Sequence, residues 1–231
     1  MKKRNHRAGG FSLVELLVGT VLFTIITGAV FSLLVSAQLR YRGESSVTET
    51  FQQANVAIDQ IVRDVHSAGY PPITSLQPAV SSAQPWNYAL PFAWSPNYPG
   101  TPCTLGTGGN CVVPGNNDLI VEADTGSGVQ WIRYSLQNGT LMRGVTPKAK
   151  GGDPATSTSS DLVPYLDNVI NQVPVFSYGF DNTAPSTPVP ASYIREVNIT
   201  LVVQSAQPDP QTKQFRTITL TGQAIRFSPN Q

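Results

Sequence analysis

The sequence contains little charge, cysteine or histidine. It has 15 Lys and Arg residues and 14 Asp and Glu residues in 231, or 13%, whereas a soluble domain ordinarily carries about 25%. The net charge of +1 argues against a strongly basic nucleic-acid-binding protein. Two cysteines cannot build a Cys-rich zinc module, and two histidines offer little to a histidine-based metal site. Hydrophobic residues make up 40% of the chain, which is enough for a core and argues against global disorder.

The missing charges are concentrated in two places. Residues 16–39 and residues 65–117 contain no Asp, Glu, Lys or Arg. The rest of the chain has a nearly ordinary share of charge, and the length fits one domain plus an additional segment. We therefore expect the function to lie in the two uncharged runs.

The first uncharged run has the properties of a membrane helix that follows a cleavable leader. Residues 16–37 would form a helix of about 33 Å, long enough to cross a bilayer core. Four basic residues precede it, which predicts a cytoplasmic N-terminus and the remainder outside. An ordinary secretory signal places its apolar region before the cleavage site, whereas here Gly9 and Gly10 come first. A cut between Gly10 and Phe11 would remove the leader, residues 1–10, and keep the helix.

Glu15 is an ionisable residue near the start of this apolar helix. Such a group is costly in hydrocarbon and needs a partner. A helix N-terminus favours an anion. The amine that cleavage would create at Phe11, in the same chain or in a neighbour, is a second positive partner.

The string GFSLVELLV at residues 10–18 resembles the class III signal of type IV pilins and pseudopilins. The resemblance implies that prepilin peptidase cuts after Gly10 and methylates Phe11. It also implies that Glu15 pairs with the N-terminal amine of an adjacent subunit during filament growth. The alternative is a plain single-pass anchor that contains a glutamate by chance.

The helical pattern continues beyond the uncharged run, through residues 40–69. Apolar residues recur at spacings of three and four, which predicts one long helix over about residues 12–68. Gly69, followed by Pro71 and Pro72, should end it. A local cap at Ser45 or Ser46 leaves open a break near Gly43. The stripe covers fewer than three heptads, so packing on the protein's own sheet is favoured over a coiled coil; its members are Val47, Phe51, Ala54, Ile58, Ile61 and Val65.

The end of this helix carries a narrower resemblance. Arg63-Asp64 followed by Ala68-Gly69-Tyr70 is similar to minor pilins of the PilW type. The strand DLIV at residues 118–121 and the hairpin NGTLMR at residues 138–143 are similar to that group as well.

The second uncharged run should be an irregular loop system, because residues 70–117 are rich in proline and aromatic side chains. Cys103 and Cys111 lie within it, and outside the cytoplasm they can form a disulfide. Two free thiols are the alternative.

The aromatic residues of this run have two interpretations. They fill space at the open end of the sheet, or they form an exposed contact surface for other subunits or an extracellular polymer. The candidate contact residues are Trp86, Tyr88, Trp94 and Tyr98.

The second half of the chain reads as strands. Asn138-Gly139 is a strong signal for a type I′ hairpin, and Gly222 is a candidate position for a bulge. Short connections predict a mostly antiparallel sheet, one face of which receives the helix, in an α+β fold. The expected strands are residues 118–123, 129–136, 140–145, 173–180, 193–203 and 215–227, with a polar loop at residues 148–161.

Motifs for catalysis are missing from the sequence, which contains no nucleophile elbow and no phosphate-binding loop. We expect no enzyme activity and no cofactor.

Asp118, Glu122 and Asp124 share one face of a strand, which we expect to be exposed to solvent. A Ca²⁺ site at Asp124 is the alternative. Side chains after the leader sum to −3, which argues against nucleic acid as a partner. A small basic patch of Lys148, Lys150 and Arg143 stays open.

Together these features predict a pilin-like protein with a long N-terminal helix packed on a β-rich domain. Residues 11–39 would be the membrane and filament helix, and residues 70–231 the domain outside the inner membrane. The resemblance implies a minor pilin that works with prepilin peptidase, other major and minor pilins, the inner-membrane assembly platform and the lipid bilayer. The alternatives are a type II secretion pseudopilin and a tip adhesin.

Overall fold

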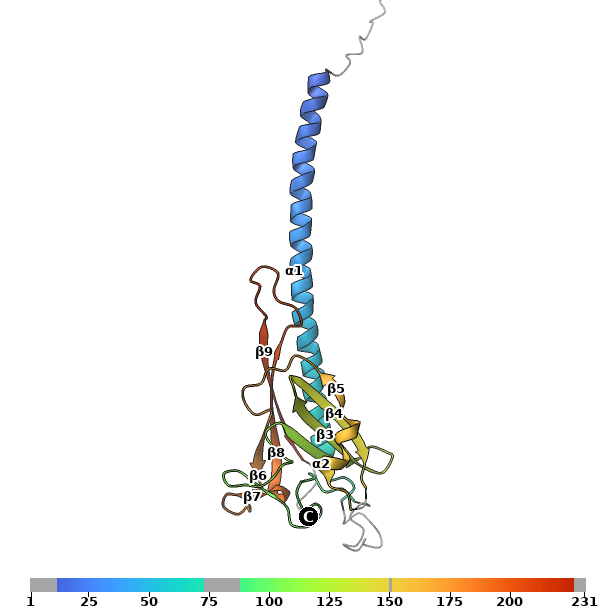
Figure 1. Ribbon diagram of the computed structural model, residues 1–231, viewed down its shortest axis with the longest axis vertical. Coiled ribbons are helices and arrows are strands. Elements are labelled where there is room, and N and C mark those ends of the chain that lie inside the picture. Colours follow the sequence, from blue (N-terminus) through green and yellow to red (C-terminus); the bar gives the residue numbers. More distant parts are fainter. Residues whose placement is uncertain (1–11, 73–87, 150, 227–231) are drawn as a thin grey trace, which may run out of the picture.

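The computed structural model describes residues 12–72, 88–149 and 151–226. It has a long N-terminal helix that projects from a β-rich domain (Figure 1). The helix packs against antiparallel sheets, which is the pilin-like α+β architecture expected from the sequence.

Helix α1 spans Leu13–Ser67 without interruption, about 82 Å at 1.5 Å per residue. Ala68 leaves helical geometry with ψ of 133°, and Gly69 follows with φ of +81°, so the chain turns away as predicted. The helix break near Gly43 that the sequence left open does not occur. Gly43 lies inside α1, where a Cβ would be 3.0 Å from Cδ of Pro210. The glycine admits a neighbouring segment and does not end the helix.

The two halves of α1 differ in burial. Residues 12–49 are exposed, apart from four half-buried positions. Ala54, Ile58, Ile61 and Val65 are buried, which confirms most of the predicted stripe. Phe51 is 43% exposed and Val47 is half-buried, so these two members of the predicted stripe are not part of the buried core.

The domain contains two main sheets, where one was expected. The first has four antiparallel strands in the order β2-β3-β4-β5, and the second has three in the order β6-β8-β9. A short ribbon, β1-β7, joins the disulfide region to the segment before β8. The strands are β1 (Thr104–Leu105), β2 (Asp118–Asp124), β3 (Val129–Gln137), β4 (Thr140–Pro147), β5 (Val163–Leu166), β6 (Phe176–Phe180), β7 (Val189–Pro190), β8 (Ile194–Gln204) and β9 (Thr217–Ile225).

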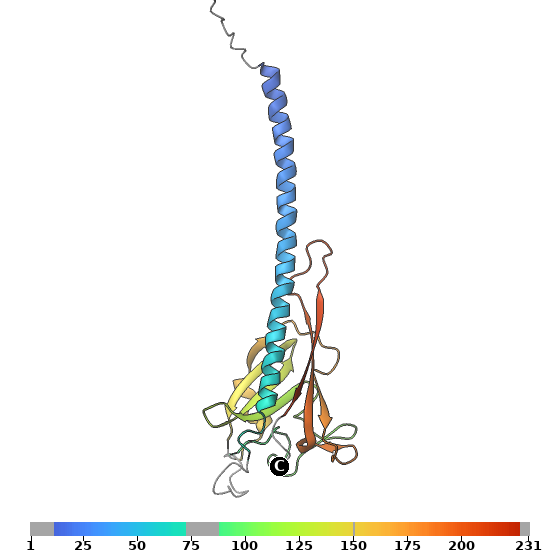
Figure 2. The same ribbon diagram turned by 180° about the vertical axis from the view of Figure 1, so that it is seen from behind.

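The second half of α1 packs against both main sheets. It contacts β8 and β9 of one sheet and β2 and β5 of the other. Figure 2 shows the helix lying over the seam between the two sheets. The core is the apolar face of α1 together with the inner faces of both sheets, and Phe176, Ile199 and Leu201 lie deep within it.

Two glycine predictions had different outcomes. Asn138 and Gly139 have φ of +50° and +81°, as the predicted type I′ turn between β3 and β4 requires. The bulge at Gly222 is wrong, because β8 and β9 pair in regular register through Ile199 and Gly222. A Cβ at Gly222 would lie 2.5 Å from Cγ2 of Ile58, so this glycine allows α1 to approach the sheet.

The polar loop expected at residues 148–161 contains two short helical elements. They are α2 (Pro154–Ser157) and a 3-10 turn, η3 (Ser159–Asp161). Asp153 caps α2, since its carboxylate accepts a hydrogen bond from the Thr156 amide at 2.9 Å.

Candidate functional site

The projecting half of α1 is an apolar rod that the domain leaves uncovered. Its large hydrophobic side chains, from Leu13 to Leu39, are 44–82% exposed. A helix that is hydrophobic on all sides needs a bilayer or neighbouring helices around it. α1 is the one helix among the described residues that is long and apolar enough to cross a membrane.

Several polar side chains on this rod make hydrogen bonds within the helix, and Glu15 lies at its head. The hydroxyls of Thr20 and Thr27 donate to the carbonyls of Leu17 and Phe23 at 2.9 and 2.8 Å. Glu15 accepts a hydrogen bond from the backbone amide of Ser12 at 3.0 Å and so caps the first turn. Its carboxylate therefore lies at the end of the helix where an anion is favoured. The predicted cleavage residues, Gly10 and Phe11, lie outside the described residues.

A buried polar cluster fastens α1 to the four-stranded sheet. Oδ2 of Asp64 accepts hydrogen bonds from Tyr134 Oη at 2.6 Å and Arg143 Nη2 at 3.0 Å, while Oδ1 accepts from Gln60 Nε2 at 2.8 Å. Burial raises the pKa of Tyr134, and the nearby charge of Asp64 raises it further. Arg143 is therefore a structural partner of α1 and does not contribute to the basic patch considered from the sequence.

Glu122 and Lys148 form an ion pair in the interior. Their side chains are 0% and 1% exposed, and Lys148 Nζ lies 2.7 Å from Glu122 Oε2. Glu122 also accepts hydrogen bonds from the Leu90 amide and from Trp131 Nε1, both at 2.8 Å. Burial lowers the pKa of Lys148, and the charge of Glu122 opposes that shift.

The expectation of a wet acidic face is therefore wrong for Glu122, because the segment around Leu90 covers strand β2 there. Lys148 does not contribute to the basic patch considered from the sequence, because its side chain is buried. Lys150 lies outside the described residues. Asp124 caps a turn by accepting from the amides of Gly126 and Gly128 at 2.7 and 3.1 Å. The described residues contain no group of three His, Cys, Asp or Glu side chains that could hold a metal ion, at Asp124 or elsewhere.

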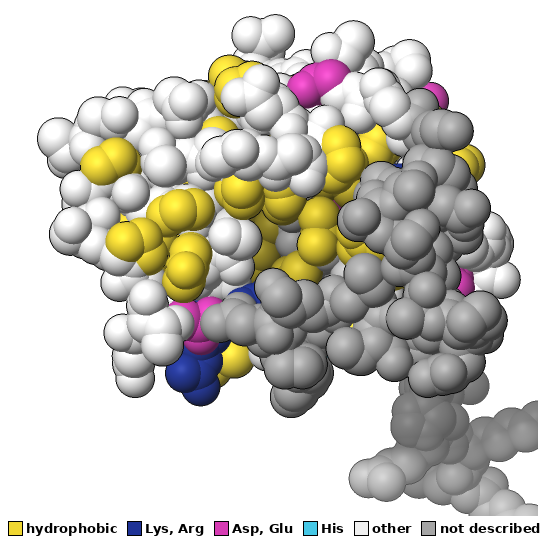
Figure 3. All heavy atoms as spheres, turned by 90° about the horizontal axis from the view of Figure 1, so that it is seen from below, with side chains coloured by type: hydrophobic (Ala, Val, Ile, Leu, Met, Phe, Trp, Pro, Cys, Tyr) yellow, Lys and Arg dark blue, Asp and Glu magenta, His cyan; other side chains and the backbone are white. Residues whose placement is uncertain are grey.

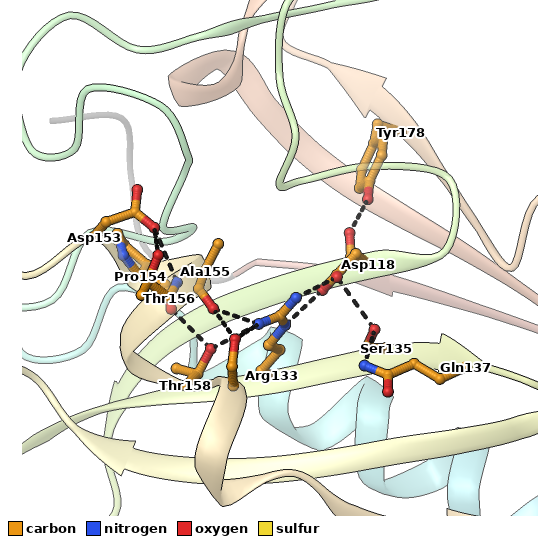
Figure 4. A network of polar contacts seen from close by, with 11 residues as sticks. Asp118, Arg133, Ser135, Gln137, Asp153, Pro154, Ala155, Thr156, Thr158 and Tyr178 are labelled. Atoms are coloured by element: carbon orange, nitrogen blue, oxygen red, sulfur yellow. Dashed lines mark hydrogen bonds and ion pairs between the residues drawn. The ribbon is translucent and has the colours of Figure 1, made fainter.

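Arg133 and Asp118 form a second network, which sequence reasoning missed (Figure 4). The guanidinium donates Nε and Nη2 to the two carboxylate oxygens at 2.9 and 2.6 Å. Its Nη1 donates to the Ala155 carbonyl at 2.6 Å, which holds α2 against the sheet. Tyr178 Oη donates to the Gly115 carbonyl at 2.7 Å, and so links the second sheet to the loop before β2.

The aromatic residues considered as a contact surface are mostly turned inward. Trp94 is 4% exposed, and its ring lies edge-to-face with that of Tyr98, with the ring centroids 5.2 Å apart. The ring centroids of Tyr98 and Trp131 are 5.8 Å apart. Tyr88 and Tyr98 are half-buried, with Lys148 Nζ 5.4 and 5.3 Å from their ring centres. Burial raises the pKa of Tyr98, as does the charge of Glu122. The prediction of an exposed contact surface is therefore wrong for Trp94, because its ring fills space beneath the loops. Trp86 lies outside the described residues.

Cys103 and Cys111 are joined by a disulfide, with their Cα atoms 5.0 Å apart. The bond closes a small loop whose first residues form β1 and pair with β7. Val112, directly after the bridge, is 66% exposed.

At the end of the domain opposite the projecting helix, few of the described side chains carry a charge. Figure 3 shows hydrophobic side chains gathered across the middle of this distal end, with a few charged ones towards the rim. The distal end therefore offers apolar surface at the point farthest from the membrane helix.

Comparison with known protein families gives a match at the head of the chain. The family described as the prokaryotic N-terminal methylation motif matches residues 5–31. No curated protein and no solved structure matches the chain.

The motif and the fold together define a type IV pilin- or pseudopilin-like protein. The motif implies processing by prepilin peptidase and assembly of the pilus type. The exposed apolar helix is consistent with a membrane-anchored prepilin.

Proposed function

We propose that this chain is a minor pilin, a non-enzymatic structural subunit of a type IV pilus. Prepilin peptidase cuts it between Gly10 and Phe11 and methylates Phe11. The mature chain stays in the inner membrane through residues 11–39 and holds its domain outside. The observation that carries the proposal is the uncovered half of α1, with Glu15 capping its first turn.

The exposed rod explains both states of such a subunit. Before assembly the bilayer covers the apolar side chains from Leu13 to Leu39. After assembly the same surface packs against the helices of other pilins, as the inner-membrane platform moves the subunit out of the lipid. A carboxylate deep in hydrocarbon costs about 2.5–3.5 kcal/mol. Glu15 therefore favours a position beside a cation, and the Phe11 amine of a neighbouring subunit supplies one.

A place at or near the tip of the filament is supported by the distal end of the domain. That end lies opposite the helix, and its described surface carries a group of hydrophobic side chains and few charged ones. A subunit at the tip would present this surface outward. The same observation favours adhesion to surfaces or glycans as a second role. Substituting the exposed Val112 with Asp tests that role, and adhesion that stays unchanged in normally assembled pili would contradict it.

A type II secretion pseudopilin would use the same motif and the same helix. Deleting the gene separates the two machines, because a minor pilin is needed for pili and a pseudopilin for export of folded proteins. Loss of secretion with normal piliation would overturn the pilus assignment and leave the pilin-like class intact.

Two measurements test the processing and the role of the helix. The intact mass of the mature protein should correspond to a chain that begins at Phe11 and carries one added methyl group. Glu15→Ala should insert into the membrane normally and be incorporated poorly into filaments. Glu49→Ala is the matched control, because Glu49 is exposed on the same helix beyond the apolar rod. A different first residue, or normal incorporation of Glu15→Ala, would contradict the proposal.

A further inference from the structure

The connection between β8 and β9 forms an arm that reaches along α1 towards the membrane. We call residues 205–216 the hairpin arm; Figures 1 and 2 both show it beside the helix, above the rest of the domain. Backbone hydrogen bonds shape it, from the Ser205 amide to the Arg216 carbonyl and from the Asp209 amide to the Gln214 carbonyl, both at 2.8 Å. Arg216 Nη2 also lies 2.6 Å from Asp209 Oδ2. The arm is therefore an ordered hairpin.

The arm is held against α1 at a defined level. Pro210 packs on Gly43, where a larger residue would place its Cβ 3.0 Å from the proline ring. With its amide oxygen towards Arg40, Gln211 accepts hydrogen bonds from Nε at 3.0 Å and from Nη2 at 3.1 Å. The tip of the arm thus lies beside residues 40–43 of the helix.

This level coincides with the surface of a bilayer that α1 would span. The uncharged run ends at Leu39, and Gly43 lies about 6 Å farther along the helix axis. The polar layer outside each face of the hydrocarbon core is roughly 5–8 Å deep. With residues 16–39 in hydrocarbon, the tip of the arm falls within the headgroup layer.

The residues at this level suit phospholipid headgroups. Arg40, Arg42 and Lys213 are exposed cations, and the fourth, Arg216, is paired with Asp209. Glu44 is the remaining acid beside the arm, so this end is net positive in a chain whose side chains after residue 10 sum to −3. Two aromatic side chains flank it, Tyr41 at 74% exposure and Phe215 at 50%. Exposed cations and aromatic rings are typical of membrane interfaces.

We propose that the hairpin arm docks the domain on anionic phospholipid headgroups before the subunit leaves the membrane for a filament. In this state Lys213, Arg40 and Arg42 contact the phosphates. The inference rests on the proposed function, because it needs α1 to span the bilayer. The arm and the helix would then contact the same bilayer face and hold the domain at a fixed orientation. Extraction of the subunit into a filament would break these headgroup contacts.

The test uses the full mature chain in lipid nanodiscs, made of phosphatidylcholine alone or with added phosphatidylglycerol. A fluorophore at Thr212→Cys reports the position of the arm, and one at Ser192→Cys, exposed on the distal side near β7, is the matched label. Lipids with a nitroxide on the headgroup quench labels that enter the headgroup layer. A third label, at Gly28→Cys, is read with a nitroxide on the acyl chain, because Gly28 has open space around it.

We expect quenching at position 212 and none at position 192. Lys213→Gln should lower the ratio of docked to undocked arm about fivefold in anionic discs, the factor expected for one basic residue near such a surface. Arg195→Gln, an exposed cation on β8 away from the arm, should leave the ratio unchanged.

Each contrary result has a separate meaning. If the label at position 28 is not quenched, the helix does not span the bilayer and the proposed function fails. If position 28 is quenched but positions 212 and 192 behave alike, the headgroup inference alone is overturned. Quenching that is the same in both lipids and insensitive to Lys213→Gln would also overturn it. Shielding of position 212 only in the presence of a second pilin would replace the lipid with a protein partner.

Discussion

Replacing Lys148 with Met should weaken the domain strongly, because it removes the cation beside a fully buried carboxylate. Glu122 is 0% exposed, and its described contacts would then be the Leu90 amide and Trp131 Nε1. Those two hydrogen bonds satisfy the oxygens but not the charge. Breaking a buried ion pair from one side typically costs about 3–5 kcal/mol. A domain of ordinary stability, about 5–15 kcal/mol, should still fold with this loss.

The cost of Lys148→Met should depend on pH in a known direction. A buried carboxylate without a cation takes up a proton more readily than one in water, because burial disfavours the charged form. Protonation in the folded variant stabilises it below the pH at which the unfolded carboxyl ionises, and this contribution disappears as pH rises. The loss of stability should therefore be smaller at pH 5 than at pH 8.

Denaturant unfolding followed by tryptophan fluorescence measures this effect, since Trp131 contacts Glu122 directly. The full chain is used in detergent, so the wild type and the variant share the same environment. The double variant Glu122→Gln, Lys148→Met carries no unpaired charge and should recover part of the loss, although its new amide NH₂ group faces one buried donor. A cost below about 1 kcal/mol, or one that is equal at pH 5 and pH 8, would refute the buried-charge reasoning.

Three further predictions follow from other contacts. Gly222→Ala should lower the unfolding free energy by about 1–3 kcal/mol, because its Cβ would lie 2.5 Å from Ile58 Cγ2; the control Gly28→Ala, with no neighbour within 4 Å, should not. Replacing Cys103 and Cys111 with Ser should lower the unfolding free energy by about 2.5 kcal/mol by chain entropy, and an unchanged midpoint would contradict a stabilising disulfide. Burial raises the pKa values of Tyr98, Tyr134 and Tyr178. Their contribution to stability is present below pH about 10 and lost above it, by up to about 1.4 kcal/mol per pH unit each. Alkaline titration by ultraviolet absorbance checks this, and normal ionisation of all tyrosines in the folded chain would contradict it.

The features that the sequence predicted well depend on neighbours along the chain. An uncharged run of sufficient length is a membrane-helix pattern wherever the domain lies. Gly69 ends α1 because it accepts positive φ and two prolines follow shortly after it, at positions 71 and 72. Asn138-Gly139 makes its turn because both residues accept positive φ. The match of residues 5–31 to a methylation motif is likewise local. Glu15 could be singled out for the same reason, since a carboxylate near the head of an apolar helix is unusual in any fold.

The features that the sequence did not predict join residues far apart. Glu122 and Lys148 are 26 positions apart, and Asp64 and Arg143 are 79 apart. A charged residue on a strand is predicted to be solvent-exposed unless a loop covers it. The sequence alone therefore predicts the wrong environment for Glu122, which is buried. Trp94 was misplaced for a related reason, because composition does not say which way a ring in an irregular loop points.

The sequence by itself determined the anchor and the periodic elements, because hydrophobic length, turn chemistry and helix periodicity act over a few residues. Only the tertiary structure decided that the strands divide into two sheets, that α1 covers the seam between them, and that the arm reaches Gly43. These outcomes depend on which distant surfaces fit together. Gly43 and Gly222 are the clearest examples of this dependence. The sequence suggested a helix break at the first and a bulge at the second, whereas each glycine makes room for a segment that packs against it.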